Sequence, residues 1–156
     1  MRLPITLLAG LFLLLPPLSV HAGDAAVETR LNARGLKYEI DGDGDYKILI
    51  SYKDEGRTQL VFVSGATESV RGLVVREVFS PAGRVGDDGL GSKALSLLEE
   101  SRTQKIGAWE VSDDVLYYVI KLPDSVDATQ LEAAIEIAAE SADNKEIELS
   151  GDKDAL

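Results

Sequence analysis

Short segments with the two-residue apolar period of β-strands follow one another along this chain, mostly with only turns between them. We expect six strands, at residues 36–40, 46–52, 58–64, 73–79, 106–111 and 115–122. A parallel sheet needs a long crossover, usually a helix, between successive strands. The chain lacks that regular alternation of strand and helix, so the pattern predicts an antiparallel sheet.

Three helices complete the pattern. Residues 25–34 and 92–102 have apolar residues at helical spacing, and Asp127 with Gln130 resembles a capping box that begins a third helix. The expected core faces are Ala94, Leu95 and Leu98 in the middle helix and Leu131, Ala134, Ile135, Ala138 and Ala142 in the last, whose Glu132, Glu136, Glu140 and Asp143 should face solvent. The order α-β-β-β-β-α-β-β-α predicts the α+β class, with an antiparallel sheet packed against helices.

The first 22 residues have the features of a secretory signal peptide. Arg2 supplies a positive charge, residues 5–15 are apolar, and small side chains precede Gly23. The alternative is a short membrane anchor, but a span takes about 20 apolar residues and prolines interrupt this stretch. We expect cleavage after Ala22, a periplasmic protein with no stable membrane anchor, and one domain over residues 23–156.

The composition excludes several kinds of chemistry. The 156 residues include no cysteine, and the one histidine (His21) and the one methionine (Met1) both lie in the expected leader. Without them, the processed chain has no thiol nucleophile, no imidazole metal ligand and no histidine-dependent triad. The net charge of −11 opposes binding to nucleic acid, because phosphates are repelled. We therefore expect a non-enzymatic protein without a cofactor.

Three aspartates form the most conspicuous charge cluster. Asp41, Asp43 and Asp45 alternate with glycines between two expected strands, which is typical of a tight hairpin turn. They also match the first positions of an EF-hand loop, but Tyr46 and Tyr52 occupy the places of its glycine and its bidentate glutamate. The sequence favours a turn and leaves a weak divalent-cation site as an alternative.

Adjacent carboxylates offer the remaining enzymatic interpretation. Glu99-Glu100 and Asp113-Asp114 could supply an acid and a base, as glycoside hydrolysis requires. However, neighbouring side chains point apart on a helix or strand, and both pairs occupy positions expected to face solvent. A carboxylate-dependent enzyme is therefore kept only as the alternative to a binding protein.

Two expected strands, residues 60–63 and 115–120, are apolar on both faces. One face of a sheet in a two-layer protein packs on helices, whereas the other normally meets water. The second face therefore needs cover, either from residues 25–34 or 82–91 of the same chain or from another polypeptide. We favour a protein partner or a homodimer. The candidate partner-binding residues are Val61, Val63, Tyr118 and Ile120.

Four stretches of the sequence resemble the YbjN family of bacterial domains. They are RGLKYEIDGDGDYKILI from Arg34, GRTQLVFVSG from Gly56, GAWEV from Gly107, and LEAAIEIAAESADNKEIELSGDKD from Leu131. The resemblance covers about residues 25–154 and implies a fold like that of the class I type III secretion chaperones. It also implies a role in sensory transduction regulation and supplies no catalytic residues. The combined prediction is an exported, regulatory YbjN-like module that binds itself or a protein partner.

Overall fold

The structure is a computed structural model that describes residues 23–86 and 90–150. Within these ranges it contains seven strands, all paired antiparallel in one sheet, and three α-helices. This confirms the α+β class and the antiparallel sheet. The expected leader, residues 1–22, lies outside the described residues, as do residues 87–89 and 151–156.

Most elements lie within a few residues of their expected ranges. They are α1 (Ala25–Ala33), β1 (Glu39–Ile40), β2 (Tyr46–Tyr52), β3 (Arg57–Val63), β4 (Glu68–Val70), β5 (Leu73–Arg84), the 3₁₀ helix η1 (Leu90–Lys93), α2 (Ala94–Thr103), β6 (Ala108–Ser112), β7 (Val115–Pro123) and α3 (Ala128–Ser150). Strand β4 is additional to the expected order. Strand β5 continues beyond Pro81, where an end was expected, because a register shift between Pro81 and Gly83 accommodates a residue that lacks an N–H group.

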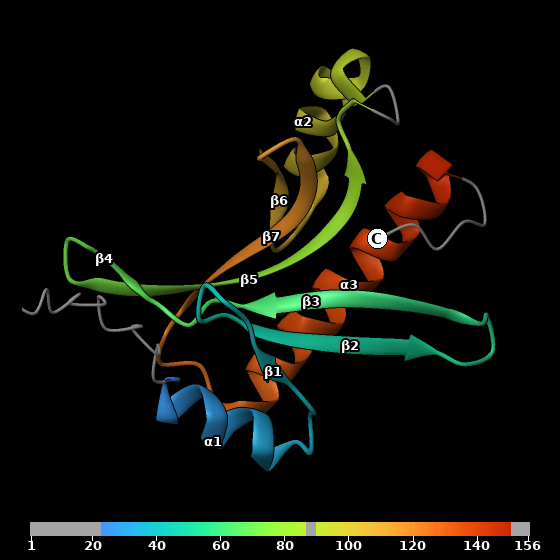
Figure 1. Ribbon diagram of the computed structural model, residues 1–156. Helices are drawn as coiled ribbons and strands as arrows, with labels where there is room; N and C mark the ends of the chain where they lie inside the picture. Colours follow the sequence, from blue (N-terminus) through green and yellow to red (C-terminus); the bar gives the residue numbers. More distant parts are fainter. Residues whose placement is uncertain (1–22, 87–89, 151–156) are drawn as a thin grey trace, which may run out of the picture.

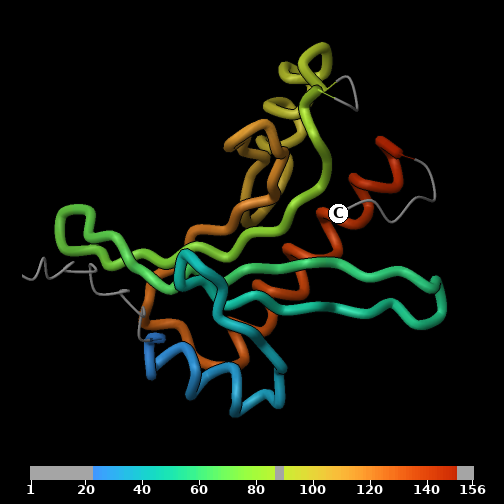
Figure 2. Tube along the Cα trace, in the orientation of Figure 1, coloured from blue at the N-terminus to red at the C-terminus, as the bar shows by residue number. Residues whose placement is uncertain are grey.

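The long strand β5 holds the two halves of the sheet together. The strand order is β1-β2-β3-β5-β7-β6, and β4 pairs with the first part of β5. Figure 2 shows the β2–β3 turn and the β4–β5 turn at opposite ends of the molecule. The strands at the two ends of this order are β1, which has only two residues, and β6.

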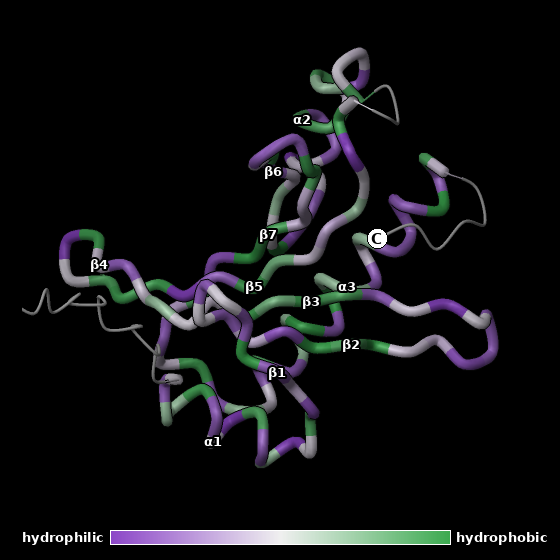
Figure 3. Tube along the Cα trace, in the orientation of Figure 1, coloured by the Kyte–Doolittle hydropathy of each residue, from purple (hydrophilic) through white to green (hydrophobic). Residues whose placement is uncertain are grey.

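The three helices lie on the same face of the sheet. Helix α3 packs on β3, β5 and β7, α1 packs on α3, and α2 packs on β6 (Figure 1). The reciprocal hydrogen bonds between Asp127 and Gln130, 2.9 and 3.0 Å long, confirm the capping box. All five expected core residues of α3 are buried, and hydrophobic and hydrophilic positions alternate along this helix in Figure 3. Within the described ranges, none of the helices has the length and apolar composition needed to cross a lipid bilayer.

Helix α2 differs from the expectation. Leu97 is its one buried residue, whereas Leu95 and Leu98 are 70% and 64% exposed. The η1 turn precedes the helix and places Leu90 in the core, so α2 presents Leu97 rather than the expected Ala94, Leu95 and Leu98 to the sheet. Two large apolar side chains are left facing solvent.

A buried ion-pair cluster joins β3 to α3. Arg57 donates from Nε to Asp143 Oδ1 at 2.9 Å and from Nη2 to Glu146 Oε2 at 3.1 Å. All three side chains are less than 10% exposed. The expectation that Asp143 faces solvent is therefore wrong, because the inward-pointing Arg57 provides its counter-charge.

A second cluster fixes α1 to the sheet. The side chain of Arg76 on β5 is 2% exposed, and its Nε donates to Asp124 Oδ1 at 2.7 Å. The same guanidinium pairs with Asp24, the N-cap residue of α1, and donates to the Ser64 carbonyl. Arg30 on α1 also binds Asp124, through the carbonyl and the carboxylate. The start of α1, β5 and the β7–α3 connection are thus tied together by charge-assisted hydrogen bonds.

Candidate functional site

The four candidate partner-binding residues lie on the helix-covered face of the sheet. Val61, Val63 and Ile120 are 0% exposed and Tyr118 is 1% exposed. They do not form an outward surface, which corrects the expectation. Alternate residues of a strand share one face of the sheet. Val63 on β3 pairs with Val78 on β5, and Val78 pairs with Ile120 on β7. The two candidates on β3 and the two on β7 therefore lie on the same face. Their neighbours in the sequence point to the opposite side of the sheet.

These neighbours form the other face of the sheet, which we call the open face. Its apolar residues are Leu49, Leu60, Phe62, Phe79, Tyr117 and Val119. The second apolar face inferred from the sequence is therefore present, and it is the face opposite to the one assigned. The two segments considered as covers do not lie over it among the described residues. Helix α1 buries Val27 and Leu31 in the helix-side core, and residues 82–84 belong to β5 itself.

Three aromatic rings cross the middle of the open face. Phe62 and Phe79 are cross-strand partners whose rings stack, with centroids 5.2 Å apart and planes 11° from parallel. Phe79 also meets Tyr117 edge-to-face, with centroids 5.8 Å apart. All three side chains are half-buried. The rings shield Val119 beside them, which is only 7% exposed. Aromatic residues are enriched at protein interfaces relative to the rest of the surface.

The charges on the open face nearly balance. Lys121 lies 2.6 Å from Glu110 Oε1 and 3.6 Å from Glu77 Oε1. The hydrogen bond to Glu110 is the main cause that raises the pKa of Lys121 above its usual value. Lys47 lies opposite Glu39 in the β1–β2 pair. The acidic character of the chain is therefore not concentrated here.

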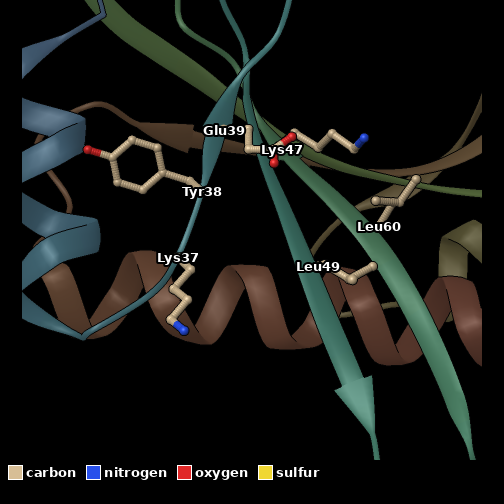
Figure 4. Close-up of a pocket in the computed structure, with 6 residues that line it drawn as sticks. All are labelled: Lys37, Tyr38, Glu39, Lys47, Leu49 and Leu60. Carbon is tan, nitrogen blue, oxygen red and sulfur yellow. The ribbon is translucent and has the colours of Figure 1, made fainter.

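A shallow groove of about 460 Å³ extends the open face toward β1. It is lined by Lys37, Tyr38, Glu39, Lys47, Leu49 and Leu60. Leu49 and Leu60 are cross-strand partners on β2 and β3, and Figure 4 shows them side by side. The Tyr38 ring instead points toward α1 and packs edge-to-face on Tyr46. The floor of the groove is therefore leucine, with charged side chains at one end.

A second groove, of about 430 Å³, lies on the helix side of the same β2 edge. It is lined by Ile50, Ser51, Tyr52, Glu55, Glu136, Glu140, Asp143 and Asn144. Burial and then the carboxylates of Asp143, Glu140, Glu55 and Glu136 raise the pKa of Tyr52 to about 12. Asp143 is neutralised by Arg57, but no ion-pair partner is present for Glu136 or Glu140 within residues 23–86 and 90–150. This groove is negatively charged.

The aspartates considered as a weak cation site are engaged in a turn. Asp41 Oδ1 accepts hydrogen bonds from the Asp43 and Asp45 amides, both at 3.0 Å. Asp45 Oδ1 accepts from the Gly65 amide at 2.9 Å, which links the β1–β2 turn to the end of β3. In the part of the chain that the structure describes, no cluster of three or more metal-ligating side chains is present. The geometry agrees with the hairpin-turn interpretation.

The carboxylate pairs considered for catalysis occupy structural positions. Asp113 and Asp114 have φ of 47° and 67°, the left-handed conformation of a tight β6–β7 turn. Glu100 accepts a hydrogen bond from Trp109 Nε1 at 2.9 Å and pairs with Lys145 at 2.7 Å. The ammonium group of Lys145 lies 5.6 Å from the centre of the Trp109 ring. Glu100 therefore links α2 to β6 through the hydrogen bond from Trp109 and to α3 through the ion pair with Lys145. Its neighbour Glu99 is exposed on α2.

Comparison with known proteins adds no family to this description: no protein-family model matches the chain, and no curated protein is significantly similar to it. The resemblance to the YbjN family stays a prediction from the quoted motifs.

Proposed function

We propose that this chain is an exported, non-enzymatic binding module that pairs with a second copy of itself through the open face of its sheet. The observation that carries this proposal is the aromatic row of Phe62, Phe79 and Tyr117, which no described element covers. Apolar surface in contact with water is unfavourable, and a twofold pair is the commonest assembly among soluble proteins. A second copy supplies an apolar face of matching chemistry.

The charge distribution supports pairing of two acidic chains. The whole chain carries a net charge of −11, which opposes association. On the open face, however, Lys47 and Lys121 lie among the glutamates at 39, 77 and 110, so the local charge is small. The remaining repulsion is screened over about 8–10 Å at physiological salt. An apolar contact at this face therefore meets little electrostatic opposition.

Two features of the sequence support the regulatory, exported part of the proposal. The resemblance to the YbjN family implies a regulator rather than an enzyme, and residues 1–22 have the features of a cleaved leader. The structural roles of Glu100 and of the Asp113-Asp114 turn also support a non-enzymatic protein. On this proposal the processed protein acts in the periplasm.

Sedimentation of the protein, exported and purified after expression of the full chain, tests the proposal. We expect a two-chain mass at micromolar concentration and a one-chain mass for Phe62→Lys, which places a charge in the aromatic row. Leu95→Lys is the matched control, because Leu95 is 70% exposed on α2 and lies away from the open face. It should keep the two-chain mass. A one-chain mass for the unmodified protein at all salt concentrations would overturn the proposed pairing.

A further inference from the structure

The outer edge of β2 is open beyond its first two residues. Strand β1 pairs only with Tyr46 and Lys47, so in the described part of the chain no strand borders β2 from Ile48 to Tyr52. The Asp41 amide donates to the Asp45 carbonyl, which shows that Asp45 directs its backbone toward the β1 side. Backbone direction alternates along a strand. Leu49 and Ser51 therefore present their N–H and C=O groups to the open edge.

The grooves of about 460 and 430 Å³ flank this edge, one on each face of the sheet. On the open face, Leu49 and Leu60 form an apolar floor. On the helix face, Glu136 and Glu140 of α3 stand beside Ile50 and Tyr52. Any strand added to this edge would send alternate side chains into the two grooves, because side chains alternate across a sheet.

We propose that the β2 edge binds an extended segment of a partner protein in which apolar and basic side chains alternate. The segment adds a strand to the sheet through hydrogen bonds to the backbone of Leu49 and Ser51. Its apolar side chains lie on Leu49 and Leu60, and its lysines or arginines reach Glu136 and Glu140. This inference rests on the proposed function, because it treats the chain as a binding module. It names a second partner at the β2 edge, where the groove shares Leu49 and Leu60 with the open face.

The negative charge of the helix-side groove favours a basic segment of a partner protein over a second copy of this chain as the occupant of the β2 edge. Among its lining residues there is no lysine or arginine, and the carboxylates of Glu136 and Glu140 lack an ion-pair partner in residues 23–86 and 90–150. Pairing of β2 with the β2 of a second copy would bring two such grooves together, and like charges would repel. A basic segment meets complementary charge instead.

Fluorescence anisotropy with a labelled nine-residue peptide of alternating valine and lysine tests this inference on the exported, full-chain product. We expect saturable binding. Two controls are a peptide of the same composition with its valines and lysines in separate blocks and a peptide of alternating valine and glutamate. Neither should bind measurably, since the first cannot fill both grooves and the second has the wrong charge.

Two sets of variants locate the site. Glu136→Gln with Glu140→Gln should weaken binding roughly tenfold, the effect of losing two partly exposed ion pairs. Glu68→Gln with Glu99→Gln removes the same charge elsewhere and should leave binding within about twofold if attraction is local. Ser51→Pro removes one outward N–H from the edge strand and should abolish binding, whereas Ser51→Ala should preserve it.

Amide hydrogen exchange of the unmodified protein gives a readout that does not depend on a variant folding. The amides of Leu49 and Ser51 should become protected when the alternating peptide is added. Equal binding of both lysine peptides, an unchanged affinity of the Glu136/Glu140 variant, or no protection at Leu49 and Ser51 would overturn the inference. Protection that rises with protein concentration without peptide would assign the edge to a second copy instead. A one-chain mass in sedimentation would contradict only the open-face dimer and not the peptide site at the β2 edge. The failure of the proposed function and the failure of this inference can therefore be told apart.

Discussion

Gly65 packs so closely against Gly44 that a β-carbon on Gly65 would lie 2.0 Å from the Gly44 carbonyl oxygen. The same residue donates its amide to Asp45 Oδ1, so the end of β3 and the β1–β2 turn meet backbone to backbone. This contact fixes the turn against the sheet beside the start of β2. It requires a residue without a side chain, because backbone atoms cannot move aside as a flexible side chain can.

We expect Gly65→Ala to lower the free energy of unfolding by about 2–3 kcal/mol through overpacking. Gly42→Ala, in the same turn, is the matched control. A β-carbon at Gly42 meets nothing within 4 Å. Its φ is not in the left-handed region. It should change stability by less than about 1 kcal/mol, in the stabilising direction. Urea unfolding followed by the fluorescence of Trp109 measures both, and equal effects of the two variants would contradict the expectation.

Arg57→Met should be the more damaging of two arginine substitutions. It leaves the buried carboxylates of Asp143 and Glu146 without this cation, and breaking a buried pair costs about 3–5 kcal/mol. Arg34→Met removes an ion pair with Glu132 in which the arginine is 41% exposed, so we expect a loss below about 1 kcal/mol. Urea unfolding of both variants gives the comparison. A similar loss for both would show that the Arg57 cluster contributes no more than a surface pair.

The same cluster explains which part of the fold could not be predicted from the sequence. The strands and α3 follow from local patterns: the Asp127–Gln130 box begins the helix, and apolar residues at helical spacing are buried. Arg57 and Asp143 are 86 residues apart, and no local pattern links them. A carboxylate that looks solvent-exposed by its polarity is buried once a distant strand supplies an arginine.

The assignment of the sheet faces failed for the same reason. In β3 and β7 both the odd-numbered and the even-numbered residues are apolar. The pattern therefore shows that both faces of the sheet are apolar, but it does not show which face the helices cover. Arg57 and Gln59 share a face with Val61, and both are buried on the side that the helices cover. Gln59 is satisfied by Ser80 and the Pro81 carbonyl. Polar residues with partners on the helix-covered face therefore mislead a prediction based on hydropathy alone.

Calcium should not stabilise the Asp41–Asp45 turn. Asp41 Oδ1 and Asp45 Oδ1 each accept backbone N–H groups, and a cation would have to compete with these hydrogen bonds for the same oxygens. We expect the melting temperature to change by less than about 1 °C between no calcium and millimolar calcium, because binding at concentrations below Kd adds almost no stability. Magnesium at equal ionic strength is the control. A rise specific to calcium would establish the weak cation site.

Asp24→Asn should reduce stability at neutral pH but not at low pH. Burial raises the pKa of Asp24, but the Ala26 amide and the Arg76 guanidinium outweigh it and hold the pKa below 3.8. A lowered pKa in the folded state gives stability that is present above the unfolded value and is lost as pH falls through the folded one. Asparagine keeps the N-cap hydrogen bond and removes only the charge. The difference in unfolding free energy between the parent protein and the variant, measured by urea unfolding, should therefore shrink as the pH falls below about 4 and disappear only once the pH is below the lowered pKa of Asp24 in the folded state.

Asp45→Asn should increase the stability of the protein at neutral pH, the opposite of the effect expected for Asp24→Asn. Burial is the main cause that raises the pKa of Asp45, the hydrogen bond from Gly65 opposes it, and the charges of Asp41 and Asp43 add to the increase. Folding therefore favours the protonated form of Asp45. The contribution of this residue to the free energy of unfolding is fully present below its pKa in the unfolded chain, and it is lost as the pH rises through its pKa in the folded protein. Asparagine still accepts from the Gly65 amide but carries no charge. We expect the variant to exceed the parent by about 0.5 kcal/mol at pH 7 and to match it below about pH 4. Urea unfolding at both pH values measures the difference, and a variant less stable than the parent at pH 7 would show that the charge itself holds the turn.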